Sequence, residues 1–514
     1  MKYKYPEDRD LMEHYNILDV EVMRALAKQC RELTDEEWAE YHLTCKINER
    51  GLPIDTEFAD QAIGYANEVA DDANTHIERL TGGKMTKHTQ RKARDAWLFP
   101  KLKPHQMKLL EVYKNDIKKT SLDYDHRQYL LACEDLDADA RELLEYLDNA
   151  GSSSLKKFSV AHHQNVKGRV HNTFRFNGAG QTGRFSGMGL QPHNIRRDVF
   201  SHNEAEALIA DVIDQREVPT PASTLARLMR SVIKSKTGQM QWVDYSSIEA
   251  RMSAWLSNCD AGEDVLDIFR GGHDIYKIAA VDMFGVSVDE VSDDQRQQGK
   301  ICVLALGYAG GVAALQSMAK NYGAAFDDTL AANLVKLWRT SNKWATYIWG
   351  EYQRAIDDAV REPFTECPVG RVTYFSDNDN YLWCRLPSGR LLSYPRPYFE
   401  EYFTPWDEQR VGPTYQSHFK PAAGDPPLRN FARGALLFQH STQAAAADLL
   451  RLALVKADAA GLNIVLHCHD EIVIDSPDPA DGDLLNEIML DMPDWAEGLP
   501  VTTGGVARGK RWGK

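Results

Sequence analysis

The sequence predicts an α+β protein built from several structural units, and three observations support this. The chain has 514 residues, and at about 150 residues per domain this length gives roughly three units. Apolar residues at helical spacing fill long segments, above all an Ala- and Leu-rich run over residues 434–460. Short apolar segments predict antiparallel strands elsewhere, since residues 464–474 read as two strands around a tight turn.

The remaining elements are expected in chain order. Helices are expected from about residue 9 to residue 80 and over most of residues 260–360, because apolar positions recur at helical spacing. An alternating pattern predicts a strand between residues 168 and 177. Proline and glycine predict loops over residues 387–397 and 421–427.

Composition excludes several classes of protein. No apolar run approaches the ~20 residues that a membrane span needs, and the chain opens on a charged segment unlike a signal peptide. Its 8 cysteines include no CxxC pair, which argues against a zinc ribbon or a disulfide scaffold and favours a reducing cytoplasm. Membrane, secreted, fibrous and disordered proteins are therefore excluded.

Positive charge is concentrated in two segments of an acidic chain. The formal net charge is −15, yet residues 81–120 hold eleven Lys and Arg against three acids, and residues 152–200 hold eight against one. Such patches are typical of proteins that follow a phosphate backbone. Two solvated helix faces remain an equal alternative. The candidate phosphate contacts are Lys118, Lys119, Lys156 and Lys157.

One motif matches a binding pattern whose structural context is absent. Residues 178–183 match GxGxxG, the dinucleotide-binding pattern. That site requires a helix to begin at the motif, so that its N-terminal amides meet the pyrophosphate. The following residues include two further glycines and Pro192 and cannot form a regular helix. No P-loop or GxSxG motif occurs either, so dinucleotide, ATPase and serine hydrolase readings have no support.

Two carboxylates lie at predicted strand ends. An apolar strand ends at Asp244, before a helix that carries Ile248 and Trp255 on one face, and Asp470 follows a second apolar strand. Asp244 could instead cap its helix, and acids such as Asp470 and Glu471 are common in turns. Together the two strand ends could place their oxygens side by side and hold hard cations.

A stripe of side chains recurs every four residues at Arg296, Lys300, Leu304 and Tyr308. On one α-helix these residues would share a face. Two cations followed by an apolar and an aromatic side chain suit a nucleoside triphosphate lying along the helix. An ordinary amphipathic helix is the alternative.

These three segments together resemble the motifs of family A DNA polymerases. Residues 244–251 resemble motif A (DYSxIExR), residues 296–308 resemble motif B (RxxxKxxxxxxxY), and residues 469–471 resemble motif C (HDE). A TGRxS…PxN segment at 182–194 is similar as well, and Leu386-Pro-Ser-Gly-Arg390 with the chain end resembles the bacteriophage branch. The sequence departs from the family at Leu304, which is usually aromatic, and at Ala309, which is usually glycine.

The resemblance implies a right-hand polymerase with a thumb, a palm that has an antiparallel sheet, and helical fingers. The expected divisions are an exonuclease remnant or helical lead-in (1–44), thumb (45–160), palm (161–258), fingers (259–425) and palm (426–514).

The resemblance also implies a site and its ligands. Two Mg²⁺ ions, with Mn²⁺ as a substitute, are expected on Asp244 and Asp470, with Lys300 as the proton donor and Glu471 as a secondary acid. Primer-template DNA and dNTPs are the expected partners, with a separate exonuclease or processivity subunit as a further candidate, in a cytoplasm (that of a bacterial host if phage-encoded). The expected dNTP contacts are Arg296, Lys300, Leu304, Tyr308, Glu249 and Tyr276. The expected DNA contacts, beside the four lysines above, are Arg184, Asn194, Gln443, Gln439, His469 and Arg251.

Two other functions remain as alternatives. A single-subunit RNA polymerase would share the palm but is expected to have a small residue in place of Glu249, which in the DNA enzymes blocks a 2′-hydroxyl. An inert DNA-binding scaffold is disfavoured because Asp244, Asp470, Lys300 and Arg296 are all present together.

The N-terminal segment resembles the end of a 3′–5′ exonuclease domain. Tyr15 and Asp19 match its YxxxD motif, although an amphipathic helix with Leu18 and Val22 facing inward is equally compatible. A single carboxylate cannot assemble a two-metal nuclease site. The chain is therefore expected to polymerise without proofreading.

Overall fold

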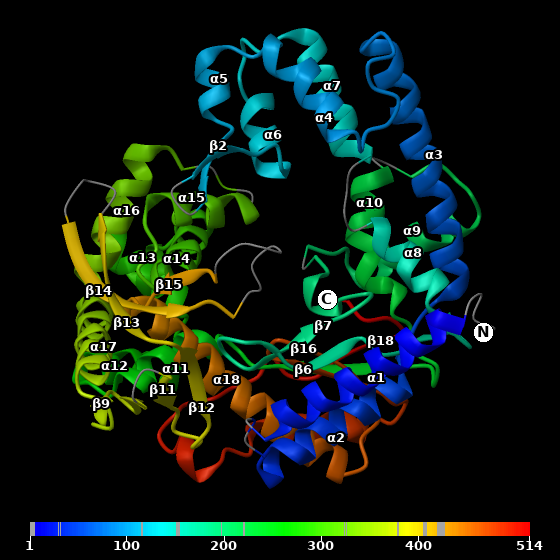
Figure 1. Ribbon diagram of the computed structural model, residues 1–514. Coiled ribbons are helices and arrows are strands. Elements are labelled where there is room, and N and C mark those ends of the chain that lie inside the picture. The colour runs from blue at the N-terminus through cyan, green and yellow to red at the C-terminus, as the bar shows by residue number, and fades with distance from the viewer. Residues whose placement is uncertain are drawn as a thin grey trace.

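Helices and antiparallel sheets occupy separate regions of the computed structural model (Figure 1). The strands of every described sheet pair in antiparallel fashion, so the expected α+β class is confirmed. The structure describes residues 6–513 except 29, 31, 115–116, 151–154, 197, 219–220, 323, 325, 378–379, 404–408 and 419–426.

A four-stranded sheet at the centre of the molecule joins segments from the middle and the end of the chain. Its order is β16 (Ile464–Cys468), β17 (Glu471–Asp475), β8 (Met240–Asp244) and β18 (Ala507–Gly509). The three longer strands are buried along nearly their whole length, which matches their apolar sequences and shows that both sheet faces are covered. The predicted strand ending at Asp244 and the predicted hairpin are both present.

Four helices and a hairpin cover this sheet. The long helix α18 is buried on most of its sides, as expected for an Ala- and Leu-rich segment, and packs against the other helices. The hairpin includes the GxGxxG segment over 178–183, so no helix begins there and a dinucleotide-binding site of that type is excluded. These elements are α2 (Asp35–Arg50), α11 (Ile248–Ser257), α18 (Gly434–Ala459), α19 (Pro479–Leu490), β6 (Phe174–Ala179) and β7 (Arg184–Gly187).

A second helical unit rises from the base on the long helix α3 (Thr56–Leu80), at the top of Figure 1. Phe58 near the start of α3 belongs to the main core, whereas Ile77 near its end belongs to a separate core with Leu110, Leu130 and Leu143. One helix therefore links two independent cores. The unit contains α4 (Arg91–Leu98), α5 (Pro104–Lys108), β2 (Glu111–Lys114), β3 (Ile117–Thr120), α6 (Tyr124–Leu131) and α7 (Ala138–Ala150).

Shorter elements surround the base of α3. Helices α8 and α9 and α10 pack along it, and a small sheet of order β1-β5-β4 lies beside them. Their bounds are α8 (Leu155–His163), α9 (His202–Ile213), α10 (Pro221–Leu228), β1 (Leu52–Pro53), β4 (Asn165–Val166) and β5 (Arg169–Val170).

A third unit consists of helices with their own core around Ile301, Leu334 and Trp338, at the left of Figure 1. It confirms the expected helical segment over 260–360. The helices that share this core are α13 (Ile275–Phe284), α14 (Asp293–Leu306), α15 (Val312–Asn321) and α16 (Asp328–Ser341). Helices α12 (Asp260–Arg270) and α17 (Lys343–Arg361) flank them and contribute buried residues to the main core.

Two sheets follow these helices, where the sequence analysis expected loops. The loop prediction is wrong for residues 391–395, which form β12, while residues 421–426 lie outside the described part. Pro395 is tolerated because β12 is an edge strand, where a missing N–H breaks no ladder. The strands are β9 (Cys367–Val369), β10 (Val372–Ser376), β11 (Tyr381–Arg385), β12 (Leu391–Pro395), β13 (Tyr398–Phe403), β14 (Gln409–Gln416) and β15 (Arg429–Phe431).

The first helix, α1 (Pro6–Ala27), lies on the surface. Leu18 and Val22 are 53% and 50% exposed, so the expectation that they face inward is wrong. Helical spacing defines an apolar face, but no described element of the chain covers it. In the part of the chain that the structure describes, no helix combines the length and the hydropathy needed to cross a membrane.

Candidate active site

Asp244 and Asp470 lie at neighbouring strand ends. Glu471 is opposite Asp244 in the register of β17 and β8, and the Tyr245 backbone N–H donates to the Asp470 carbonyl over 3.1 Å. Residues opposite one another in antiparallel strands have Cβ atoms about 4.5–5.5 Å apart. The sheet therefore brings Asp244 to the adjacent pair Asp470 and Glu471, which lie more than 220 residues later in the sequence.

Glu471 has a different environment from the two aspartates. Burial raises the pKa of Glu471 to about 7, the Arg230 guanidinium and the Trp512 hydrogen bond oppose this rise, and the Asp244 and Asp470 charges add to it. The Trp512 indole N–H donates to Oε1 of Glu471, and Arg230 stacks over the Trp512 ring at 4.0 Å. Trp512 and Arg230 were missed by the sequence analysis, because only the fold brings the end of the chain and the segment around residue 230 to Glu471.

The site fits hard divalent cations. Carboxylate oxygens are the donors that such ions prefer, and the charges of Asp244 and Asp470 add to the rise that burial causes in the pKa of Glu471, so the three acids lie within electrostatic range of one another. A Cβ at residue 504 would lie 2.7 Å from Oδ1 of Asp244. Gly504 thus lets the chain end pass close to that carboxylate without covering it.

Helix α14 presents the predicted cationic residues beside the tyrosine Tyr276 on α13. Arg296 and Lys300 lie 5.5 Å and 5.8 Å from the Tyr276 ring centroid. Arg296 Nε also lies 2.6 Å from Oδ2 of Asp274, an acid that caps α13 and that the sequence analysis missed. Leu304 is 37% exposed on the same helix. The structure therefore brings together Arg296, Lys300 and Tyr276, three of the residues expected to contact a dNTP.

Tyr308 differs from its predicted setting, because α14 ends at Leu306. Only Arg296, Lys300 and Leu304 of the four-residue stripe are therefore helical. The turn after α14 directs the Tyr308 side chain toward Phe438 and Glu249. Its ring centroid lies 6.1 Å from that of Phe438, and its hydroxyl donates to Glu249 over 3.5 Å. Burial, with a smaller contribution from the Glu249 charge, raises the pKa of Tyr308, so the phenol stays protonated.

Ala309, which follows Tyr308, has a φ of +59°. This left-handed conformation costs a residue with a Cβ roughly 1–2 kcal/mol. We expect Ala309→Gly to raise the free energy of unfolding by about 1 kcal/mol, measured by denaturant titration. Ala332→Gly in the exposed middle of α16 is the matched control and should lower it by about 0.5–1 kcal/mol. Destabilisation by both substitutions would contradict the strain argument.

Glu249 links the helical unit to the hairpin. In addition to its contact with Tyr308, Glu249 has its Oε1 atom 3.5 Å from Nη1 of Arg184 on β7. Arg184 comes from β7, Glu249 from α11 and Tyr308 from the turn after α14, and each was predicted separately from the sequence. The fold joins them in one chain of contacts.

The predicted DNA contacts fall into several settings. Gln439 and Gln443 are one helical turn apart on α18 and both half-buried. His469 lies within hydrogen-bond distance of the His193 carbonyl (3.1 Å), and the exposed Asn194 donates to Gln191. Lys156 is exposed on α8, and Lys157 donates to the carbonyls of Leu190 and Gln191 at 3.0 Å each. Lys118 and Lys119 are on β3, but their side chains lie outside the described residues.

Arg251 is a correction to the predicted set. It is 7% exposed and donates to Ser246 O, Pro500 O and Thr502 Oγ1 at 2.8–2.9 Å. Its guanidinium also stacks over Phe269 at 4.2 Å. These internal contacts tie the start of α11 to the end of the chain, so Arg251 has a structural role rather than a DNA contact.

Comparisons with known proteins identify the family. The sequence model described as DNA polymerase family A matches residues 66–379, which is more than half of the chain. The chain belongs to DNA polymerase family A. It is a DNA-directed DNA polymerase.

Individual relatives agree with this assignment. The polymerase is 30% identical over 523 aligned positions to the DNA polymerase of Bacillus phage SP02, which covers 97% of this chain and 74% of the relative. It is also 31% identical to DNA polymerase I of Pseudomonas aeruginosa over 85 residues, which cover 16% of this chain and 9% of that protein.

A solved structure shares the fold of this family A polymerase. The POL domain of Pol1 from M. smegmatis, in complex with DNA primer-template and dNTP, superposes with a TM-score of 0.63 and 18% sequence identity. The match covers 92% of this chain and 70% of that chain. The right-hand polymerase architecture predicted from the motifs is therefore confirmed.

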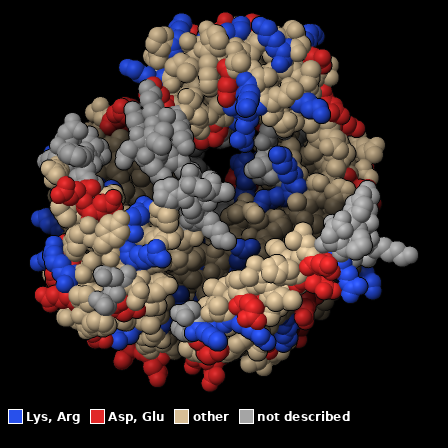
Figure 2. Space-filling view, viewed as in Figure 1, with Lys and Arg blue, Asp and Glu red and all other residues tan. Residues whose placement is uncertain are grey.

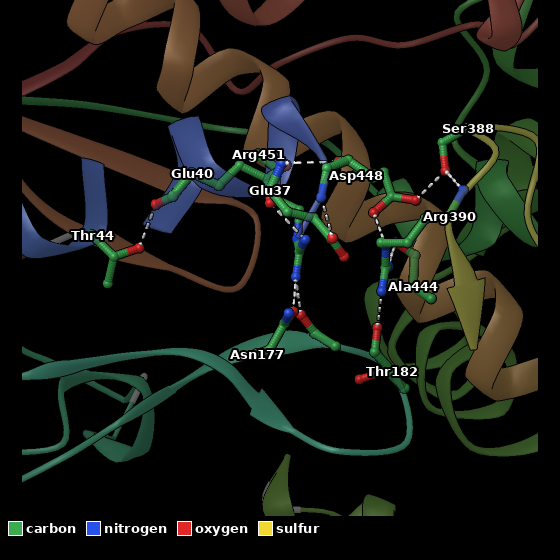
Figure 3. Close-up of polar contacts among 12 residues, drawn as sticks. Glu37, Glu40, Thr44, Asn177, Thr182, Ser388, Arg390, Ala444, Asp448 and Arg451 are labelled. Atoms are coloured by element: carbon green, nitrogen blue, oxygen red, sulfur yellow. Dashed lines mark hydrogen bonds and ion pairs between the residues drawn. The ribbon is translucent and has the colours of Figure 1, made fainter. Parts of the chain in front are cut away.

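Two arginines behind the site form a buried ionic network that the sequence analysis did not assign (Figure 3). Arg390 Nε lies 2.6 Å from Oδ1 of Asp448, and Arg451 Nη1 lies 2.7 Å from Oε2 of Glu40. Burial raises the pKa of Glu40 to about 7, although the Arg451 guanidinium opposes this shift. Arg390 belongs to the Leu-Pro-Ser-Gly-Arg segment, so its resemblance to phage polymerases was the available signal.

The raised pKa of Glu40 predicts a pH dependence of stability. Since the ordinary value is 4.5, the folded protein binds more protons than the unfolded chain between about pH 4.5 and about pH 7. Stability from this group is therefore greatest at low pH and falls as the pH rises through that window. We expect Glu40→Gln to remove this part of the slope, measured as the change in Tm between about pH 5 and about pH 7.5. An unchanged slope would contradict the assignment to Glu40.

Proposed function

We propose that this polymerase extends a DNA primer by two-metal nucleotidyl transfer, and that it replicates a phage genome. The observation that carries the mechanism is the position of Asp470 in the turn directly before β17, whose first residue Glu471 lies opposite Asp244 at the end of β8. Two Mg²⁺ ions held there, or Mn²⁺ in their place, would activate the primer 3′-hydroxyl and neutralise charge on the leaving oxygen. The relationship to a phage polymerase supports the biological role, which loss of phage DNA accumulation on gene inactivation would test.

The side chains around the carboxylates have complementary roles in this proposal. Arg296 and Lys300 bind the triphosphate, and Lys300 donates a proton toward the departing pyrophosphate. Tyr276, Leu304 and Tyr308 lie toward the base and sugar, and Glu249 occupies the space that a ribose 2′-hydroxyl would need. The support is the clustering of Arg296, Lys300 and Tyr276 and the contact of Glu249 with Tyr308.

The architecture supports the division of the chain into thumb, palm and fingers. We propose that residues 45–160 act as the thumb, 259–425 as the fingers, and 161–258 with 426–514 as the palm, residues 1–44 forming a helical lead-in. Separate cores over 77–147 and 283–345 support the first two units. Figure 2 shows a hollow between the upper unit and the rest of the molecule, with Lys and Arg side chains on its walls. Such a surface suits the phosphates of a primer-template duplex.

On the duplex side, Arg184 and Gln443 would donate to minor-groove acceptors. Every base pair presents acceptors there, so these contacts test base-pair shape rather than sequence. Gln439, His469 and Asn194 flank the same region, and Lys156 would contact phosphate.

Primer extension tests the mechanism directly. Purified protein, a primer-template and dNTPs should give extension with Mg²⁺, none after chelation, and recovery with added Mg²⁺ or Mn²⁺. Equal extension after exhaustive chelation would contradict the two-metal proposal. Extension with rNTPs at the dNTP rate would favour an RNA polymerase instead.

Glu249→Ala tests sugar discrimination. Removing this side chain opens the space beneath the sugar, so we expect the rNTP/dNTP ratio of kcat/KM to rise by about tenfold or more. Glu249→Gln retains the volume without the charge and should keep the ratio within about threefold of the wild type. An unchanged ratio for Glu249→Ala would exclude the steric role.

A further inference from the structure

The turn that carries Arg184 is held by two buried arginines. Arg390 Nη1 donates to the Thr182 carbonyl over 3.1 Å. Arg451 Nη2 donates to the Gly183 carbonyl and to Oδ1 of Asn177. The two backbone acceptors immediately precede Arg184, so any shift of this turn moves the start of β7.

The same arginines are anchored to helix α18, which carries Gln443. Arg390 Nη2 donates to the carbonyl of Ala444 over 3.0 Å, next to Gln443 in the sequence. Its Nε pairs with Asp448 one turn further along, and Ser388 donates to the other oxygen of Asp448. Arg451 lies on α18 itself. Figure 3 shows both guanidinium groups pointing toward the strand and turn that carry Asn177 and Thr182.

The geometry leaves little room for another arrangement. Gly183 has a φ of +67°, and a Cβ there would lie 2.3 Å from Nη1 of Arg390. The side chains of Arg390 and Arg451 are 13% and 2% exposed. A buried guanidinium is costly unless its donors are used, and its planar fork holds several acceptors in fixed directions. The network therefore sets the distance between the turn and α18.

We propose that Arg390 and Arg451 are positioning residues that set Arg184 and Gln443 at the spacing of two acceptors in one minor groove. The inference rests on the proposed minor-groove contacts of Arg184 and Gln443. Arg390 bridges the two elements, and Arg451 fixes the turn to the helix from its other side. Neither arginine touches substrate.

Replacement of a minor-groove acceptor tests this role. Guanine at the primer terminus is compared with 3-deazaguanine, which lacks the N3 acceptor, and the ratio of extension rates is the deaza penalty. Wild type should show a penalty of about tenfold, as for the loss of one hydrogen bond from a transition state, and Arg184→Ala should show almost none. Arg390→Lys and Arg451→Lys, which keep the charge but not the fork, should reduce the penalty to within about threefold of Arg184→Ala.

Two further variants separate positioning from general stability. Glu40→Gln removes the ion pair of Arg451 but leaves both of its contacts with the turn, so its deaza penalty should stay at the wild-type value. Ser388→Ala is a milder change that removes one hydrogen bond to Asp448 and so loosens Arg390. It should lower the deaza penalty with little change in Tm, and it replaces a lysine variant that fails to fold.

The outcomes distinguish this inference from the proposed function. A full wild-type penalty in folded Arg390→Lys, Arg451→Lys and Ser388→Ala would overturn the positioning role while leaving the minor-groove contacts intact. A wild type with no penalty would overturn the minor-groove contacts themselves, and the positioning role with them. If Glu40→Gln lost as much of the deaza penalty as the two lysine variants, the loss would reflect stability rather than geometry. That result would also overturn the positioning role.

Discussion

Asp244→Asn and Asp470→Asn should each lower the rate of primer extension by at least about a hundredfold. A bound metal ion contributes several kcal/mol of transition-state charge stabilisation, and each 1.36 kcal/mol corresponds to about tenfold in rate. Each substitution removes one of two charges that lie at the same end of the sheet, Asp244 at the end of β8 and Asp470 directly before β17. Single-turnover extension with saturating dNTP measures the effect.

The controls for this prediction use binding and a matched acid. Primer-template affinity and Tm should stay near the wild-type values, because asparagine keeps the shape of the side chain. Asp264→Asn, at an exposed acid on α12, should extend primers at the wild-type rate. More than a tenth of the wild-type rate in either Asp244→Asn or Asp470→Asn would refute the two-metal assignment.

Lys300→Ala should slow the chemical step by about a hundredfold, the lower range for the loss of a positioned proton donor. It should also weaken dNTP binding, since a cation beside the phosphates is lost. Rapid-quench measurement of the extension rate against dNTP concentration separates the two effects.

The matched control is Lys336→Ala at an exposed lysine on α16, which should leave both quantities unchanged. Lys300→Arg keeps the charge but is a much weaker acid, so it should restore dNTP binding more than the chemical rate. A Lys300→Ala variant that changed only primer-template affinity would show that α14 faces DNA rather than the nucleotide.

Local patterns predicted most of the elements that form the site. The strand ending at Asp244, the hairpin over 464–474 and the long helix over 434–460 were all visible in the sequence and are present as β8, β16–β17 and α18. Each pattern is local, because apolar periodicity within about ten residues reflects the face that an element buries. The prediction failed at Tyr308, since the end of α14 depends on the packing of the next residues.

Non-local contacts account for what the sequence analysis did not find. Trp512 reaches Glu471 from the end of the chain, and Arg451 reaches Glu40 across more than 400 residues. Arg251 belonged to a motif segment, yet its donors are used internally. A motif specifies which residue is present, whereas burial and hydrogen-bond partners decide whether its side chain can reach a ligand.

By itself, the sequence determined the family, because three motifs in order specify it, and the same motifs predicted which carboxylates and cations belong to the site. Only the tertiary structure decided that the pairing of β8 with β17 places Asp244 opposite Glu471 and beside Asp470, that Glu249 joins Arg184 to Tyr308, and that buried arginines hold the turn before Arg184. The physical reason is that periodicity and turn chemistry act over a few residues, whereas sheet register and buried ion pairs join groups hundreds of residues apart and exist only once the cores have packed.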